Sequence, residues 1–167
     1  MNWEIITATS EIIGAIGINA TLVYLSIQIR ENTKASQAAS RLVITQDCRK
    51  IVNHQLDINN ATAYRNGLWD YPNMPYEENI LFSTLLTDDA LFFQGVLAQF
   101  DSGQLENETY DAYLTWFACI ASTPGGAAWW EDTGKLVFLP HMVAIVEQRF
   151  AKGGLYDIRQ LSQFQRK

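Results

Sequence analysis

The sequence predicts an all-α protein in which one N-terminal transmembrane helix continues into a small cytoplasmic helical bundle. Three observations favour this fold class: residues 12–29 are uncharged and mostly apolar, later apolar residues recur at helical spacing, and no segment shows the alternation typical of strands. A chain of 167 residues, 48% of them hydrophobic, is sufficient for one packed domain. We expect residues 1–30 to form the membrane helix and residues 31–167 to form the helical domain.

The N-terminal segment is long enough to cross a bilayer. A helix over residues 12–29 extends roughly 27 Å, which matches the hydrocarbon core of a membrane. Lys and Arg outnumber Asp and Glu directly after this segment, so we expect the N-terminus outside and residues 30–167 in the cytoplasm. The acidic start of the chain argues against a cleaved signal peptide. The polar residues within the segment leave a core helix of a soluble protein as an alternative.

Small and polar residues in this part of the chain recur at spacings of four and three, which places them on one narrow face of a helix. This face, called the seam below, consists of Ser10, Gly14, Gly17, Thr21, Tyr24 and Gln28. Small residues allow a second helix to approach closely, and Thr or Gln side chains form hydrogen bonds across such contacts in lipid. The seam therefore predicts a helix–helix interface. Asn19 and Ser26 share a different face, which predicts a second contact or the lining of a pore.

The first helix is expected to continue beyond the membrane, because no Pro or Gly occurs between Ile18 and Asn66. The seam face then carries Ala35, Ala38, Leu42 and Thr45. A turn-prone run over residues 57–60 ends this helix, and a short helix is expected over residues 61–69.

Two longer helices follow. Pro75 precedes a helix over residues 77–100 with one broad apolar face, and Gly103 marks its end. Asn107 is expected to cap the next helix, which runs to about residue 122.

The last part of the chain has equally clear start signals. Thr123 caps a helix whose first residue is Pro124, and this helix carries the Trp129–Trp130 pair. Adjacent aromatic residues of this kind are expected to place one ring in the core and the other at its edge. Pro140 opens a final amphipathic helix that ends at a pair of glycines.

The charge distribution is uneven. The chain has 18 acidic and 12 basic residues, and this net charge of −6 argues against a nucleic-acid-binding protein. All basic residues lie outside residues 66–134, a stretch that contains eleven of the acidic ones. We expect this stretch to form a solvated acidic face. A cationic partner, a cation and the basic ends of the same chain are alternatives.

One acidic residue stands apart from the others. Helical spacing places Asp89 inside the apolar stripe of its helix. If buried, its carboxylate needs a hydrogen-bonding partner or a cation from an end of the chain. The simpler expectation is an acid at the edge of the stripe that reaches solvent or caps another helix.

No catalytic constellation is evident. Cys48 and Cys119 lie in apolar-periodic helices, where a small buried apolar residue is the usual interpretation, although a nucleophilic Cys–His pair remains an alternative. His54 and His141 lack the Glu-x-x-His spacing of a di-metal bundle. We therefore expect no catalytic residue, no cofactor and no metal.

The segment YLSIQIRENT, residues 24–33, resembles the Y-L-x-x-Q-[IV]-R-x-N-T signature of a widespread bacterial family of uncharacterised function. Members of that family begin with a Gly-, Ala- and Ile-rich membrane helix, which Gly14, Ala15 and Ile16 match here. The resemblance implies a small helical domain anchored in the bacterial inner membrane. It implies no activity and no active-site residues.

Taken together, these patterns predict a membrane-anchored protein without catalytic activity that acts as an oligomeric accessory, sensing or scaffolding subunit. The expected partners are the lipid bilayer and, through the seam, a second copy of the chain or another membrane protein. One alternative is a homo-oligomeric pore lined by Asn19 and Ser26. The other is a soluble helical enzyme or ligand-binding bundle, in which residues 12–29 are a core helix and Asp89 or a Cys–His pair forms the site.

Overall fold

The computed structural model describes residues 3–158, and these residues form helices and short connections without a strand. The all-α fold class is confirmed. The chain divides into two compact units, residues 1–39 and residues 40–167, and helix α1 (Trp3–Gln55) contributes to both. The boundary expected from the sequence lies somewhat earlier, after residue 30.

The first unit consists of the N-terminal part of α1. Its exposed large apolar side chains include Ile12, Ile13, Ile16, Ile18, Leu22, Val23, Leu25, Ile27 and Ile29. Among residues 3–158, two helices are long and apolar enough to cross a membrane, α1 and α3 (Tyr76–Asp101). The most apolar 18-residue segment of α3 is half buried, as expected of a core helix. The corresponding 18-residue segment of α1, called its apolar window below, has no buried residue within the described part of the chain.

The second unit contains residues 40–55 of α1 and the helices that follow. Besides α3 these are α2 (Ile58–Asp70), α4 (Asn107–Ala121), α5 (Pro124–Trp129), α6 (Lys135–Val137) and α7 (Pro140–Lys152). A 3-10 turn (Tyr71–Asn73) follows α2, and a π-helical turn (Trp130–Gly134) joins α5 to α6.

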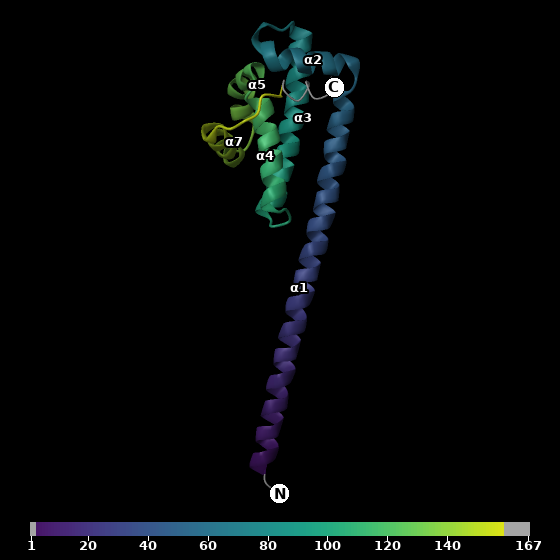
Figure 1. Cartoon of the computed structure of the whole chain (residues 1–167), viewed down its shortest axis with the longest axis vertical. Helices are drawn as coiled ribbons and strands as arrows, with labels where there is room; N and C mark the ends of the chain where they lie inside the picture. Colours follow the sequence, from purple (N-terminus) through teal and green to yellow (C-terminus); the bar gives the residue numbers. More distant parts are fainter. Residues whose placement is uncertain (1–2, 159–167) are drawn as a thin grey trace. The chain divides into compact units, whose positions relative to one another are not determined.

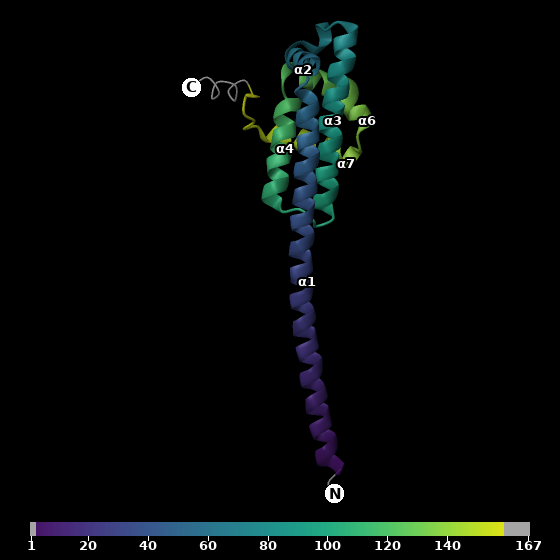
Figure 2. The same ribbon diagram turned by 90° about the vertical axis from the view of Figure 1, so that its right-hand side faces the viewer.

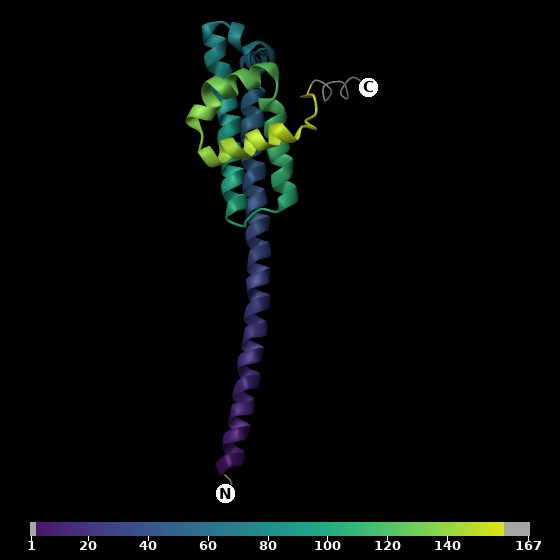
Figure 3. The same cartoon turned by 90° about the vertical axis from the view of Figure 1, so that its left-hand side faces the viewer.

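The helices of the second unit form three layers. Helices α3 and α4 lie side by side in the middle layer (Figures 1 and 2). Residues 40–55 of α1 cover one face of this pair, and Figure 2 shows this segment in front of both helices. Helices α5 and α7 cover the opposite face, where α7 crosses α3 and α4 (Figure 3). The core therefore lies on both sides of the α3–α4 pair.

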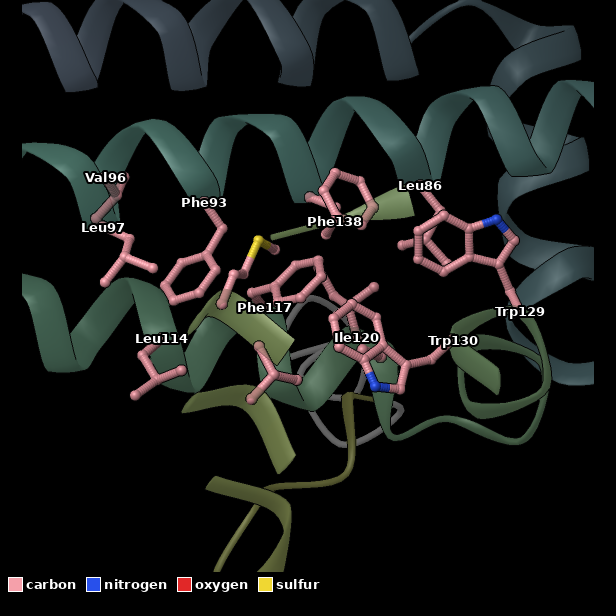
Figure 4. Close-up of a cluster of buried hydrophobic side chains, with 14 of the residues drawn as sticks. Leu86, Phe93, Val96, Leu97, Leu114, Phe117, Ile120, Trp129, Trp130 and Phe138 are labelled. Atoms are coloured by element: carbon pink, nitrogen blue, oxygen red, sulfur yellow. The ribbon is translucent and has the colours of Figure 1, made fainter. Parts of the chain in front are cut away.

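Aromatic side chains fill the core between the middle layer and α5–α7 (Figure 4). The Phe93 and Phe117 rings stack with their centroids 5.3 Å apart. Trp129 and Trp130 are both buried, with 0% and 1% of their surface exposed, so the expectation that one ring lies at the edge of the core is wrong. Both rings are enclosed because α5, which ends at Trp129, packs against α2 and α4, and because Phe138 contacts both of them.

Most helix ends follow from local signals. The Thr123 hydroxyl accepts a hydrogen bond from the Gly126 N–H at 3.1 Å, which confirms the predicted cap. Gly153 ends α7 with a φ of 64°, a left-handed conformation that suits glycine. Asn107 is wrongly predicted as a cap: Glu106 holds the cap position with extended backbone, and Asn107 is the first helical residue.

Helices α2 and α5 approach each other at two glycines. A Cβ built on Gly125 of α5 would overlap the carbonyl oxygen of Gly67 in α2, and a Cβ on Gly67 would overlap the ring of Phe82. Gly125 is therefore a packing residue at a crowded helix crossing, and a Cβ on the next residue, Gly126, would overlap the Ile120 carbonyl oxygen at the end of α4.

Candidate functional site

The seam lies open along α1. All six of its residues, Ser10, Gly14, Gly17, Thr21, Tyr24 and Gln28, are exposed. A Cβ on Gly14 or Gly17 would meet no atom within 4 Å. The Thr21 hydroxyl donates to the Gly17 carbonyl oxygen at 2.9 Å, and the Gln28 amide donates to the Tyr24 hydroxyl at 3.1 Å. Because these bonds join residues four apart, the polar members of the seam stack on one face of the helix.

Asn19 and Ser26, the expected second polar face, bond to their own helix. The Asn19 amide donates to the Ala15 carbonyl oxygen at 2.8 Å, and the Ser26 hydroxyl donates to the Val23 carbonyl oxygen at 2.8 Å. Each of the two side chains thus has one hydrogen bond to its own helix, and both are exposed.

Asp89 is enclosed at a junction of three helices. Its side chain lies on α3 with 0% exposure, so the expectation of an acid that reaches solvent is wrong. The Tyr64 hydroxyl of α2 donates to Oδ2 at 2.5 Å, and the Gln55 amide of α1 donates to both carboxylate oxygens at 3.0 and 3.3 Å. Both donors are neutral, and no cation of the described residues pairs with this carboxylate.

The enclosure changes the proton affinity of this group. Burial raises the pKa of Asp89 from its ordinary value of 3.8 to about 7, against the opposing effect of the hydrogen bonds from Tyr64 and Gln55. The nearby charge of Asp88 raises this pKa further. Burial and the neighbouring Asp89 raise the pKa of Tyr64 well above 10, so this hydroxyl remains a donor at neutral pH.

The Asp89 junction is bordered by a groove and by two other titratable side chains. Gln55 and Tyr64 also line a groove of about 500 Å³ whose other walls include Val52, Leu56, Leu68 and Trp69. Burial, followed by the charge of Asp89, raises the pKa of the Cys48 thiol on α1. On the outside of the same helix pair, His54 Nδ1 lies 3.7 Å from Asp88 Oδ2.

Sequence reasoning selects Asp89 but misses both of its partners. Tyr64 and Gln55 lie 25 and 34 residues away along the chain, so no local spacing connects them to the carboxylate. The sequence did offer one indication, the position of Asp89 within an apolar stripe. A carboxylate buried at such a position needs a hydrogen-bond donor from another part of the fold.

The cysteines and histidines do not meet. His54 pairs with Asp88, and His141 Nε2 lies 3.3 Å from Asp101 Oδ2. Cys119 is buried beside Tyr156, and its thiol pKa is raised chiefly by burial. Among residues 3–158, no three His, Cys, Asp or Glu side chains gather as a metal site would require.

Basic residues from both sides of the acidic stretch pair with it. The ion pairs are Arg41–Glu106 (3.1 Å) and Lys135–Glu131 (2.6 Å), and two histidines lie beside carboxylates of the stretch, His54 at 3.7 Å from Asp88 and His141 at 3.3 Å from Asp101. Their side chains are largely exposed, and such surface pairs add little stability. The chain's own basic flanks thus neutralise part of the acidic surface.

Comparisons with known proteins matched no protein family, no curated protein and no solved structure. The resemblance of residues 24–33 to a family signature stays a prediction.

Proposed function

We propose that this chain is a membrane-anchored assembly protein: residues 12–29 cross the bacterial inner membrane, the N-terminus lies outside, and the helical domain lies in the cytoplasm. In this role it is an accessory, sensing or scaffolding subunit that associates with a second copy through the seam. The observation that carries the proposal is the complete exposure of the apolar window of α1. Each large apolar side chain left in water costs roughly 1.5–3 kcal/mol relative to burial, so lipid or another helix is needed to cover this surface.

The polar side chains of the segment also suit a lipid environment. Besides the two bonds of Asn19 and Ser26, Thr21 bonds to the helix backbone and Gln28 bonds to Tyr24. These are all the polar side chains within residues 12–29. Because each has a partner within the same helix, none enters the hydrocarbon region without a hydrogen bond.

The face of α1 that packs on the helical domain is centred away from the seam. Ser40 and Ile44 are buried there, whereas Leu42, which continues the seam, is exposed. Thr45, the next position of the seam face, is also exposed but shares a hydrogen bond with Tyr113 of α4, so the two faces meet at this residue. A second copy is the favoured occupant, because its identical small residues allow two helices to approach closely over several turns.

The anchor is tested by comparing the full chain with a chain that starts at Asn32. We expect the full chain to remain in the membrane fraction after alkaline carbonate extraction and the shortened chain to be water-soluble and helical by circular dichroism. A full chain that is released by carbonate would contradict the proposal and would favour the core-helix alternative.

The seam is tested by Gly17→Leu, which adds a large side chain where two helices are proposed to meet. We expect cross-linked dimers in detergent to fall at least about tenfold, corresponding to about 1.4 kcal/mol of association free energy, while the helical content is unchanged. Ala15→Leu makes a similar addition away from the seam and serves as the matched control. Equal cross-linking of the two variants would rule out the seam as the interface.

A further inference from the structure

We propose that Asp89 is a proton-binding site that controls how firmly the C-terminal end of α1 is held on the helical domain: firmly when the carboxyl group is neutral, and loosely when it is ionised. The proposal concerns only residues 40–158 and stands whether or not the N-terminal segment enters a membrane.

The composition of the junction disfavours the ionised form of Asp89. The titratable groups that face Asp89 are Cys48 from α1, Tyr64 from α2 and Asp88 from α3 itself. None of them supplies a positive charge. Tyr113 of α4 lies beside Cys48 and carries no positive charge either. A buried carboxylate that is held only by neutral donors is stable in its protonated form and costly in its ionised form.

The neighbouring groove offers the ionised Asp89 carboxylate a route back to water. Gln55 is both a donor to Asp89 and a wall of the 500 Å³ groove. When the end of α1 moves away, the carboxylate loses this donor but becomes open to water from the groove. The ionised form gains more from hydration than from one amide bond, because an ion is stabilised far more strongly by water than by a neutral dipole in an apolar site.

Residues 40–55 of α1 are attached to the domain more weakly than α2 is. Helix α2 buries Ala63, Gly67 and Leu68 between its neighbours. Residues 40–55 of α1 contribute only Ser40 and Ile44 to the buried residues, and their ion pairs to Glu106 and Asp88 are exposed. A segment with few buried apolar contacts opens at the lowest cost in free energy, so α1 is the element that moves.

The direction of the pH effect follows from linkage. The pKa of Asp89 is about 7 when the junction is closed, and its ordinary value is 3.8. Opening of the junction therefore releases a proton from Asp89 at any pH between these two pKa values. The fraction of open molecules rises about tenfold for each pH unit between about 4 and 7, and it levels off above pH 7 because the group is then ionised in both states.

Backbone hydrogen exchange of the full chain in detergent, measured between pH 5 and 8, tests the proposal. Released from α3, the last turns of α1 lose their packing and fray, so their amides report opening. After correction for the intrinsic rates, we expect protection at residues 50–56 to fall about tenfold per pH unit up to pH 7 and then to level off. Amides of α7 should show no such slope, because α7 opens without exposing Asp89.

Three variants assign the effect. Asp89→Asn should abolish the pH dependence of protection at residues 50–56. Tyr64→Phe removes a hydrogen bond that lowers the pKa of Asp89, so it should extend this pH dependence above pH 7. His54→Gln, a control for the other titratable link between α1 and α3, should keep it. A flat profile in the unmodified chain, a slope that persists in Asp89→Asn, or a slope lost in His54→Gln would each overturn the proposal.

Discussion

Replacement of Asp89 by Asn is expected to raise the free energy of unfolding by about 4 kcal/mol at pH 8 and to change it little at pH 4. The pKa of this carboxyl group is about 7 in the folded chain and 3.8 in its ordinary state. Each tenfold difference in proton affinity corresponds to about 1.4 kcal/mol. Since the folded-state pKa is raised, stability is fully present below pH 3.8 and is lost as the pH rises towards 7. An amide, which carries no charge, avoids this loss.

The measurement is urea unfolding of the full chain in detergent at pH 4, 6 and 8, with circular dichroism as the signal that reports loss of helix. Asp88→Asn is the matched control, because Asp88 is a neighbouring carboxylate that remains partly exposed. We expect this control to shift stability by less than about 1 kcal/mol at each pH. Equal pH profiles for the unmodified chain and Asp89→Asn would show that Asp89 does not bind a proton in this range.

Gly125→Ala is expected to lower the free energy of unfolding by about 3 kcal/mol or more. The added methyl group would overlap the carbonyl oxygen of Gly67, which belongs to the backbone of α2 and has no rotamer to change. The two helices would have to separate, and the contact between Gly67 and the Phe82 ring would loosen with them. Chemical unfolding at one pH is sufficient to measure this loss.

Gly95→Ala provides the comparison. Gly95 also lies within a helix, α3, but a Cβ there would meet no atom within 4 Å. We expect this change to stabilise the chain by about 0.5–1 kcal/mol, because alanine has the higher helix propensity. If both glycine variants shifted stability in the same direction, close packing of α2 and α5 would not be the reason for Gly125.

The fold follows from the sequence where the signals are local. Thr123 and Gly153 act within a few residues of their own positions, and the structure has the helix ends that they predict. The Trp129–Trp130 pair was predicted incorrectly, because the burial of its second ring depends on helices that approach from elsewhere in the chain.

The same distinction applies to the candidate sites. The seam is a pattern of spacing within one helix, so it is visible in the sequence alone. The Asp89 junction combines side chains of three helices, and its two donors are residue types that occur throughout the chain. Only the packing of α1 and α2 on α3 brings them together.

The internal hydrogen bonds of residues 12–29 have a consequence for motion in a bilayer. Each polar side chain of the segment takes part in a hydrogen bond within the same helix, and the donors that these bonds leave over are one N–H each of Asn19 and Gln28 and the O–H of Tyr24. In the proposed bilayer, rotation of the helix about its long axis would therefore change the polar groups that face lipid by only these few donors. The steric fit of the small seam residues against the proposed partner would then contribute strongly to the angle at which the two helices meet.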